Sequence, residues 1–442
     1  MRKGAMLAGM TVLDSTHDPK LRAWVRSANA PDSEFPIQNL PLGVFSRDGE
    51  APRGGVAIGD QVLDLRAALK AGLISGEAAE AAAEPRLNRL MAMGRPASRD
   101  LRAQLSRLLA EGSDAASQGD SILVPMSAAR MQLPVAIANF SDFMASRDHS
   151  SRLGARRDPN SPLPQAFDSL PVAYHSRASS VHVSGEPVVR PNGQWKRKDG
   201  VHFGPTEALD YELELAVWLA GENALGVPVP MSRAPERLFG YGLLNDWSAR
   251  DVQRWEMPPL GPFLAKSLST TISPWVVTAE AMIPFEVPAA RTEGVAPPLP
   301  YLDSEWNRAR GGLAIAMEVW LLTSRMCAEG SGPARLTATD FMHMAWTPAQ
   351  MVTHHATNGC NLLPGDLLGS GTCSGPTDEG RACMAEIILS GPIHLPNGET
   401  RRFLEDGDEV IFRGRAHAEG AVSIGFGECR AQILPAPAWP AD

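Results

Sequence analysis

The order of apolar and polar residues along the chain predicts two parts of different character. From residue 36 to 65, short apolar runs alternate with turns, and Gly59-Asp60 between two apolar pairs is typical of a β-hairpin. Residues 66–111 change to alanine, leucine, arginine and glutamate with a helical period. We therefore predict a mostly β (α+β) protein with an N-terminal domain at 1–130 and a larger domain at 131–442.

Beyond residue 130 the pattern is one of many short apolar strands separated by long polar loops. The strongest strand candidates are residues 181–183, 209–219, 313–322, 385–389, 409–412 and 422–425. Residues 187–206 and 286–311 are rich in proline, glycine and arginine, so we expect loops there. Residues 1–35 are polar, and we expect an extension packed on the surface.

The stretch from Tyr241 to Lys266 contains the largest group of candidate site residues. Its apolar start reads as a buried strand, and Asp246 then reads as a helix-start signal. In a helix, Asp246, Arg250 and Gln253 stand at i, i+4 and i+7 and share one face. The alternative is an N-cap with a solvated Asp–Arg pair, which carries no chemistry.

Two glutamates alternate with leucines in the predicted strand at 209–219. Because side chains two residues apart lie on one face of a strand, Glu212 and Glu214 share a face. Neighbouring carboxylates repel unless a cation lies between them, and Mg²⁺ or Ca²⁺ with Asp246 as a third ligand would suit this pair. An edge strand with a hydrated face is the alternative.

Residues 140–154 read as a helix that places Asp142, Ser146 and His149 on one face. This spacing could place a metal at one end and a water-activating imidazole at the other, although a structural histidine is the alternative. Glu386 lies between apolar residues of the predicted strand at 385–389, and it is a candidate to orient a histidine.

Composition excludes several classes of function. The 442 residues carry a formal charge of −9 and a pI near 5.6, which argue against a nucleic-acid or anionic-membrane surface. The five cysteines have no CxxC spacing, which favours reduced thiols in a cytoplasmic protein. The N-terminal apolar run is too short for a signal peptide or a membrane span.

Taken together, these segments resemble the fumarylacetoacetate hydrolase family. One matching segment reads Ser141-Asp-Phe-Met-Ala-Ser-Arg-Asp-His149, and a second runs from Asn245 to Lys266. The others are residues 35–45, 56–60, 170–180, 209–214, 353–355, 358–361, 365–368 and 425–429. They extend in the family's order from about residue 35 to the C-terminus. The resemblance implies an SH3-like N-terminal barrel, a C-terminal mixed β-roll catalytic domain, and a homodimer.

The resemblance also assigns roles to individual residues. It implies His149 as the water-activating base, with Glu386 as its orienting carboxylate. The implied metal ligands and their immediate neighbours are Asp142, Glu212, Glu214, Asp246, Lys266 and Thr270. The implied groups around the developing oxyanion are Arg250, Gln253 and Lys266. The implied substrate-binding positions are Met144, Arg157, Tyr174, Gln253, Met257 and Thr372.

The activity implied is metal-dependent hydrolysis of a carbon–carbon bond in a 1,3-diketo acid, with Mg²⁺ or Ca²⁺ as cofactor. Fumarylacetoacetate is the expected substrate, at the end of tyrosine and homogentisate breakdown. Met144 and Met257 stand where the family has tyrosines that bind the terminal carboxylate, so this end of the pocket is more apolar. The alternatives are a relative acting on a β-diketone with a less acidic tail, and a non-catalytic metal or small-molecule binder.

Overall fold

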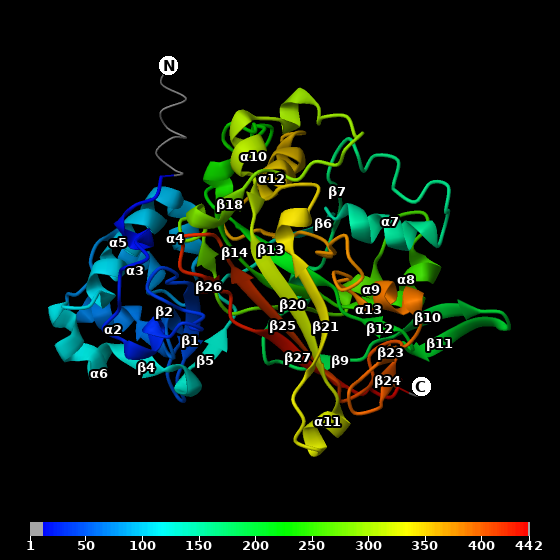
Figure 1. Ribbon diagram of the computed structural model, residues 1–442, viewed down its shortest axis with the longest axis horizontal. Coiled ribbons are helices and arrows are strands. Elements are labelled where there is room, and N and C mark those ends of the chain that lie inside the picture. Colours follow the sequence, from blue (N-terminus) through cyan, green and yellow to red (C-terminus); the bar gives the residue numbers. More distant parts are fainter. Residues whose placement is uncertain (1–11, 441–442) are drawn as a thin grey trace.

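A computed structural model describes residues 12–440 of the chain and confirms the mostly β prediction. Figure 1 shows a smaller N-terminal part in blue and cyan beside a larger part built mainly of strands. Residues 1–11, the start of the expected polar extension, lie outside the described residues. From Thr16 to Ala28 that extension buries several side chains against its surroundings, so it is better packed than its polar composition predicts.

The N-terminal part is a five-stranded antiparallel sheet in the order β4-β3-β2-β1-β5. Its strands are β1 Leu42–Ser46, β2 Arg53–Ile58, β3 Gln61–Asp64, β4 Leu123–Pro125 and β5 Arg130–Gln132. The predicted hairpin joins β2 to β3, and Gly59 takes a positive φ of 56° at its turn. The predicted helical segment forms α2 Leu65–Lys70, α3 Glu77–Ala82, α4 Asn88–Met93 and α5 Arg95–Leu109, followed by α6 Gly119–Ile122.

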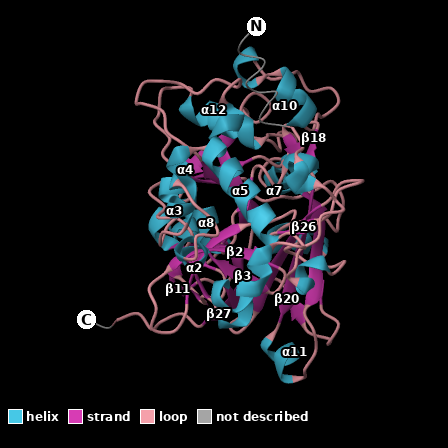
Figure 2. Ribbon diagram, turned by 90° about the vertical axis from the view of Figure 1, so that its left-hand side faces the viewer, coloured by secondary structure: helices cyan, strands magenta, loops and turns pink. Residues whose placement is uncertain are grey.

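The two parts share buried side chains. Val56 and Leu101 of the N-terminal part belong to the same apolar cluster as Trp218, Phe239 and Ile272 of the larger part. Figure 2 shows α2, α3 and α5 on the side of the molecule where β2 and β3 lie. The N-terminal part is therefore anchored to inner strands of the larger part by common packing, and the division near residue 130 stays a prediction.

The larger part contains an eight-stranded sheet in the order β7-β6-β22-β13-β14-β16-β8, with β17 also paired to β14. Its strands are β6 Phe140–Met144, β7 Val172–His175, β8 Val181–Val183, β13 Leu213–Leu219, β14 Leu238–Asp246, β16 Thr270–Ile272, β17 Val277–Thr278 and β22 Leu367–Gly369. Every residue of β13 and β14 is buried, so this central pair can hold charged side chains away from water.

A six-stranded sheet packs against the first one, and its strand order is β21-β20-β25-β27-β9 with β26 on β25. Its strands are β9 Val188–Val189, β20 Ile315–Leu322, β21 Ala334–Asp340, β25 Glu409–Ala416, β26 Ile424–Gly425 and β27 Cys429–Leu434. Leu215 and Val217 of β13 share one buried cluster with Val319 of β20 and Phe412 of β25. The common core fixes the sheet that carries the candidate site.

Short elements complete the larger part. The remaining strands are β10 Asn192–Arg197, β11 Gly200–Pro205, β12 Leu209–Asp210, β15 Ser248–Ala249, β18 Glu286–Val287, β19 Gly312–Leu313, β23 Ile393–His394 and β24 Thr400–Arg401. Its helices are α7 Arg147–Ala155, α8 Arg250–Glu256, α9 Leu264–Ser267, α10 Glu305–Arg310, α11 Ser324–Ala328, α12 Pro348–Ala356 and α13 Met384–Ile387.

Three sequence predictions about these elements were wrong. The expected loop at 187–206 contains β9 and the β10–β11 hairpin, which projects from the body in Figure 1. The expected loop at 286–311 contains β18 and α10. The expected strand at 385–389 begins as α13, because backbone N–H groups of Met384 and Ala385 bond the Asp210 carboxylate and start a helical turn.

Candidate active site and metal centre

Three carboxylates from separate strands of the eight-stranded sheet meet at one point. Asp142 lies on β6, Glu214 on β13 and Asp246 at the end of β14. One oxygen atom from each side chain lies within 4.8 Å of the other two. Pairing of β22 with both β6 and β13 brings the first two residues together, because Gly369 of β22 is opposite Asp142 and also beside Glu214.

These carboxylates are short of partners. The Asp142 Oδ1, Glu214 Oε1 and Asp246 Oδ1 atoms are buried and have no hydrogen-bond partner among residues 12–440. Burial, and next the charge of Asp246, raise the pKa of Asp142 well above its ordinary value. Burial, and next Asp142 and Asp246, do the same to the pKa of Glu214. Hard divalent cations bind such oxygen atoms, so the three residues fit a divalent metal site.

A glycine makes room beside this cluster. A Cβ atom on Gly369 would lie 2.5 Å from Asp142 Oδ1 and 2.9 Å from Glu214 Oε2, which is too close for either carboxylate to stay in place. Two residues later, the backbone N–H of Gly371 donates to Glu214 Oε2 at 2.9 Å. The Gly369–Gly371 turn therefore positions Glu214 through a backbone bond and leaves the space that Asp142 and Glu214 need.

Two buried cations balance the neighbouring carboxylate of Glu212. Lys266 Nζ lies 2.5 Å from Glu212 Oε2 and 2.6 Å from Asp246 Oδ2, and Arg250 Nη1 lies 2.7 Å from Glu212 Oε1. Burial alone would raise the pKa of Glu212, but Lys266 and Arg250 together hold it below its ordinary value. Despite burial, the charges of Asp246 and Glu212 raise the pKa of Lys266. Glu212 thus lies beside the three-carboxylate cluster, and its role as a ligand stays a prediction.

The predicted face of Asp246, Arg250 and Gln253 is arranged differently from expectation. Asp246 ends β14, and α8 starts only at Arg250, because β14 continues its pairing with β16 through Asp246. The Arg250 guanidinium donates to Gln253 Oε1 at 3.2 Å and to Asp210 Oδ2 at 2.8 Å rather than to Asp246. The three side chains are still connected: Lys266 and Glu212 link Asp246 to Arg250, and Arg250 bonds Gln253.

Tyr174 and Thr270 also lie close to Asp246. The Tyr174 hydroxyl is 2.8 Å from Asp142 Oδ2 and 2.9 Å from Asp246 Oδ2. Thr270 of β16 is the backbone pairing partner of Asp246. The structure therefore brings the two residues to the cluster, where Tyr174 contacts the carboxylates directly.

A histidine–carboxylate pair lies on the other side of Glu212. His149 Nδ1 is 3.0 Å from Glu386 Oε2, while His149 Nε2 is 3.4 Å from the Thr372 hydroxyl and 3.9 Å from Glu212 Oε1. Burial opposes the charge of Glu386, but His149 and hydrogen bonds lower its pKa to about 2. The prediction of one helix over 140–154 was wrong, because residues 140–144 pair as β6 and Ser146 then caps α7. His149 nonetheless faces the site.

Two residues that the sequence reasoning missed support this pair. Arg152, one turn after His149 on α7, donates to Glu386 Oε1 at 3.3 Å. Asp210 accepts from Arg250 and from the first N–H groups of α13, the helix that carries Glu386. The alternation of acidic residues at 210, 212 and 214 was a signal for Asp210. Arg152 had none beyond its position three residues after His149.

The predicted substrate-binding residues are only partly gathered. Met144 ends β6, beside the cluster, and it is half-buried. Arg157 follows the C-terminal end of α7, is exposed, and its side chain has no hydrogen bond or ion pair within the described residues. Met257 follows the last residue of α8 and is 38% exposed. The structure brings Tyr174, Thr372 and Gln253 to the site, whereas no hydrogen bond or ion pair within residues 12–440 holds the side chains of Arg157 and Met257 there.

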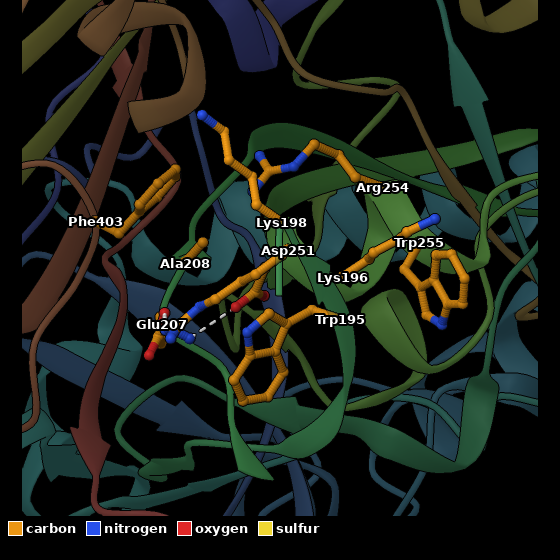
Figure 3. Close-up of a pocket in the computed structure, with 10 residues that line it drawn as sticks. Trp195, Lys196, Lys198, Glu207, Ala208, Asp251, Arg254, Trp255 and Phe403 are labelled. Atoms are coloured by element: carbon orange, nitrogen blue, oxygen red, sulfur yellow. Dashed lines mark hydrogen bonds and ion pairs between the residues drawn. The ribbon is translucent and has the colours of Figure 1, made fainter. Parts of the chain in front are cut away.

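Two cavities lie away from this cluster. The larger, of about 690 Å³, is lined by aromatic and charged residues of the β10–β11 hairpin and of α8. Figure 3 shows Asp251, Arg254 and Trp255 of α8 around it. These residues alternate along the helix with Arg250 and Gln253, so α8 borders both the cavity and the candidate site. The chemistry described above lies at the buried carboxylates and not in this cavity.

The comparison with known proteins covers nearly the whole chain. Residues 138–434 match the family described as Fumarylacetoacetate (FAA) hydrolase C-terminal, and residues 38–134 match Fumarylacetoacetase N-terminal. The chain is 45% identical to the fumarylacetoacetase of Homo sapiens, over 92% of this chain and 98% of that protein. It is 43% identical to the fumarylacetoacetase of Oryza sativa, over 94% and 98% of the two chains.

A solved structure supports the fold. The fumarylacetoacetate hydrolase from Exiguobacterium antarcticum superimposes with a TM-score of 0.51 at 17% identity, over 90% of this chain and 99% of that one. Among the described residues, no helix combines the length and the apolar character that a membrane crossing requires. The family matches and the identities over more than nine-tenths of the chain show that this protein belongs to the fumarylacetoacetate hydrolase family.

Proposed function

We propose that this protein hydrolyses the bond between one carbonyl carbon and the central carbon of a 1,3-diketo acid, and that fumarylacetoacetate is its substrate. The observation that carries the proposal is the group of three unpartnered buried carboxylate oxygens close to the His149–Glu386 pair. The names of the full-length relatives favour the same activity. The products would be fumarate and acetoacetate, as part of tyrosine breakdown.

A divalent cation, Mg²⁺ or Ca²⁺, would be held by Asp142, Glu214 and Asp246, with Glu212 as a further ligand and Lys266 and Thr270 beside it. Such an ion supplies Lewis-acid polarisation of the two diketone oxygens. Asp142, Glu214 and Asp246 offer it the oxygen atoms that lack other partners. Lys266 spans Glu212 and Asp246, so it keeps the cluster compact while limiting the net negative charge.

His149 would act as the general base in this proposal. Its Nδ1 atom faces Glu386, which leaves Nε2 as the atom that takes a proton from water. The water oxygen then forms a bond to one carbonyl carbon, and the bond between that carbon and the central carbon breaks. The departing carbon takes up the proton that His149 accepted from water, so fumarate and acetoacetate leave, one water is consumed and the histidine is again neutral.

Three donors would stabilise the negative charge that forms on the attacked carbonyl oxygen: Arg250, Gln253 and Lys266. Donors that are fixed before the reaction stabilise such an oxyanion without reorganisation, and one well-placed donor contributes roughly 3 kcal/mol. Arg250 and Lys266 are buried and already oriented by carboxylates. Their fixed positions support the oxyanion assignment.

The substrate's tail is where a second candidate arises. Tyr174, Thr372 and Gln253 would contact the diketone, and Arg157 would bind the terminal carboxylate through a charge-assisted hydrogen bond. Met144 and Met257 offer no donor, which favours a β-diketone with a less acidic tail.

The proposal also includes a homodimer in the cytoplasm, the assembly and location expected from the family resemblance.

The two candidates are separated by comparing kcat/KM for fumarylacetoacetate and for an analogue whose tail is neutral. We expect the double substitution Met144→Tyr and Met257→Tyr to shift the ratio toward fumarylacetoacetate, because each hydroxyl adds a donor for the carboxylate. An unchanged ratio would mean that the methionines only fill space, and it would support fumarylacetoacetate as the substrate. If the wild type has a lower kcat/KM for fumarylacetoacetate than for the neutral analogue, the second candidate, a β-diketone with a less acidic tail, is favoured.

A further inference from the structure

One carboxylate joins the two helices that carry the cationic and amide groups of the site. Glu256 is the last residue of α8, and its side chain accepts three backbone N–H groups at the start of α9. Glu256 Oε1 lies 2.7 Å from the nitrogen of Phe263 and 2.9 Å from that of Ala265, and Oε2 lies 3.1 Å from that of Leu264.

These bonds replace a cap that α9 does not have from its own sequence. Phe263 occupies the N-cap position and its side chain accepts no hydrogen bond. The first N–H groups of any helix lack partners inside the helix and also form its positive end, so a carboxylate is favoured there. Because Glu256 supplies it from α8, the two helices are fixed relative to each other.

The residues so connected are those of the candidate site. α8 begins with Arg250 and contains Gln253, whereas Lys266 follows Ala265 directly on α9. The intervening loop contributes little packing of its own, since Leu260 is 96% exposed and Phe263 is 70% exposed. Within the loop, one backbone bond joins Gly261 to Met257. Ala265 of α9 packs against Val252 of α8, and Glu256 supplies the hydrogen bonds to the start of α9.

We propose that Glu256 is a positioning residue, which sets the Lys266 ammonium against Arg250 and Gln253 by fixing the start of α9 to the end of α8. The inference rests on the proposed function in so far as Lys266 takes part in catalysis. Glu256 itself touches neither Glu212 nor Asp246, so it acts through Lys266.

The first test compares Glu256→Ala with Glu256→Gln by steady-state kinetics on fumarylacetoacetate. Alanine removes all three bonds, and we expect kcat to fall about 10- to 100-fold with KM changed little, as for loss of an interaction made in the transition state. Glutamine keeps one acceptor oxygen for Phe263 and Ala265, so we expect it to recover most of the loss. Equal kcat values for Glu256→Ala and the wild type would overturn the proposal.

The second test separates positioning from a general loss of stability. In a Lys266→Met background, Glu256→Ala is expected to have little further effect on kcat, because the group it positions is gone. Fully multiplicative losses would overturn the proposal. Asp64→Ala is the control in the N-terminal part: it removes a carboxylate that caps α2 and pairs with Arg53, and it is expected to lower Tm without lowering kcat.

A third measurement does not depend on activity. Lys266 is 4% exposed, so its amine resists acylation in the wild type, and mass spectrometry should find it modified faster in Glu256→Ala. An unchanged rate would count against the proposal. If the alanine variant does not fold, Glu256→Asp, one methylene shorter, takes its place in each comparison. Wild-type protein with no turnover would refute the proposed function alone, because the acylation comparison would still decide the role of Glu256.

Discussion

Arg152 and Glu386 form an ion pair that leaves one carboxylate oxygen of Glu386 for His149. Arg152 Nη1 lies 3.3 Å from Glu386 Oε1, whereas His149 Nδ1 lies 3.0 Å from Oε2. The other guanidinium nitrogen, Nη2, donates to the carbonyl oxygens of Gly375 and Thr377. One arginine thus fixes the orientation of Glu386 and the loop that follows Thr372.

We expect Arg152→Met to lower kcat by about 10-fold, because Glu386 keeps the Ser374 hydroxyl but loses the partner of its Oε1 atom, and the proposed base becomes misaligned. KM and metal affinity should change little, because Arg152 bonds Glu386, Gly375 and Thr377 and none of the three carboxylates of the cluster. Arg147→Met is the control. Arg147 lies on the same helix as Arg152, its ion pair with Asp168 is more exposed, and its loss should leave kcat at the wild-type value. A wild-type kcat in Arg152→Met would show that the clamp has no catalytic consequence.

Removal of one cluster carboxylate should have opposite effects with and without metal. In EDTA, Glu214→Gln should unfold at the same temperature as the wild type or higher, because the repulsion that raises the pKa of Glu214 is relieved. With Mg²⁺ or Ca²⁺ at about 100 times Kd, the wild type should gain about 2.7 kcal/mol of unfolding free energy, and the variant should not. Calorimetry in both conditions measures this. A full metal-induced gain in the variant would exclude Glu214 as a ligand.

Gly369→Ala should weaken metal binding without a mutation of any ligand. The added Cβ atom would lie 2.5 Å from Asp142 Oδ1, so the carboxylate has to move. We expect metal affinity, measured by titration calorimetry, to fall at least about 10-fold, the scale seen when a neighbour that orients a ligand is changed. Gly332→Ala, which meets no atom within 4 Å, should bind metal as the wild type does. Equal affinity in the two variants would contradict the crowding argument.

Stability should fall as pH rises from about 4.5 to about 7 because of Glu286, which lies outside the site. Burial raises its pKa to about 7 even though Arg310 and Arg95 lower it. The folded state therefore binds a proton between pH 4.5 and 7 that the unfolded state has lost, so this contribution is complete below about 4.5 and is lost as pH rises through 7. Glu286→Gln should remove up to about 1.4 kcal/mol per pH unit of this slope. Urea unfolding at pH 5, 6 and 7 measures the slope, and an unchanged slope would rule out Glu286 as its source.

Local patterns were sufficient for part of the architecture. The hairpin at Gly59, the helical segment at 66–111 and the central strands follow from period and turn chemistry, and the structure contains all of them. Where tertiary pairing competes with local preference, the sequence misled: residues 140–144 have a helical spacing but pair with β7 and β22. The N–H groups that Asp210 binds made a helix of the expected strand at 385–389.

In the candidate site, too, local pattern predicted part of the arrangement and tertiary pairing decided the rest. The alternation of Glu212 and Glu214 pointed to buried charge, but alternation does not reveal which glutamate faces Asp142 and which faces Lys266. That distinction depends on Gly369, more than 150 residues away along the chain, and on its pairing with β6. Roles such as the base at His149 came from the family resemblance, since spacing alone allowed a structural histidine.

The central claim is that this protein hydrolyses fumarylacetoacetate with His149 as the general base. The most direct measurement follows the loss of fumarylacetoacetate and the appearance of fumarate and acetoacetate with Mg²⁺ or Ca²⁺ present, for the wild type and for His149→Ala. We expect stoichiometric products from the wild type, and a kcat that is lower by about 10²-fold or more in the variant, with metal affinity and KM nearly unchanged. A wild type that forms neither product, or a variant with nearly wild-type kcat, would contradict it.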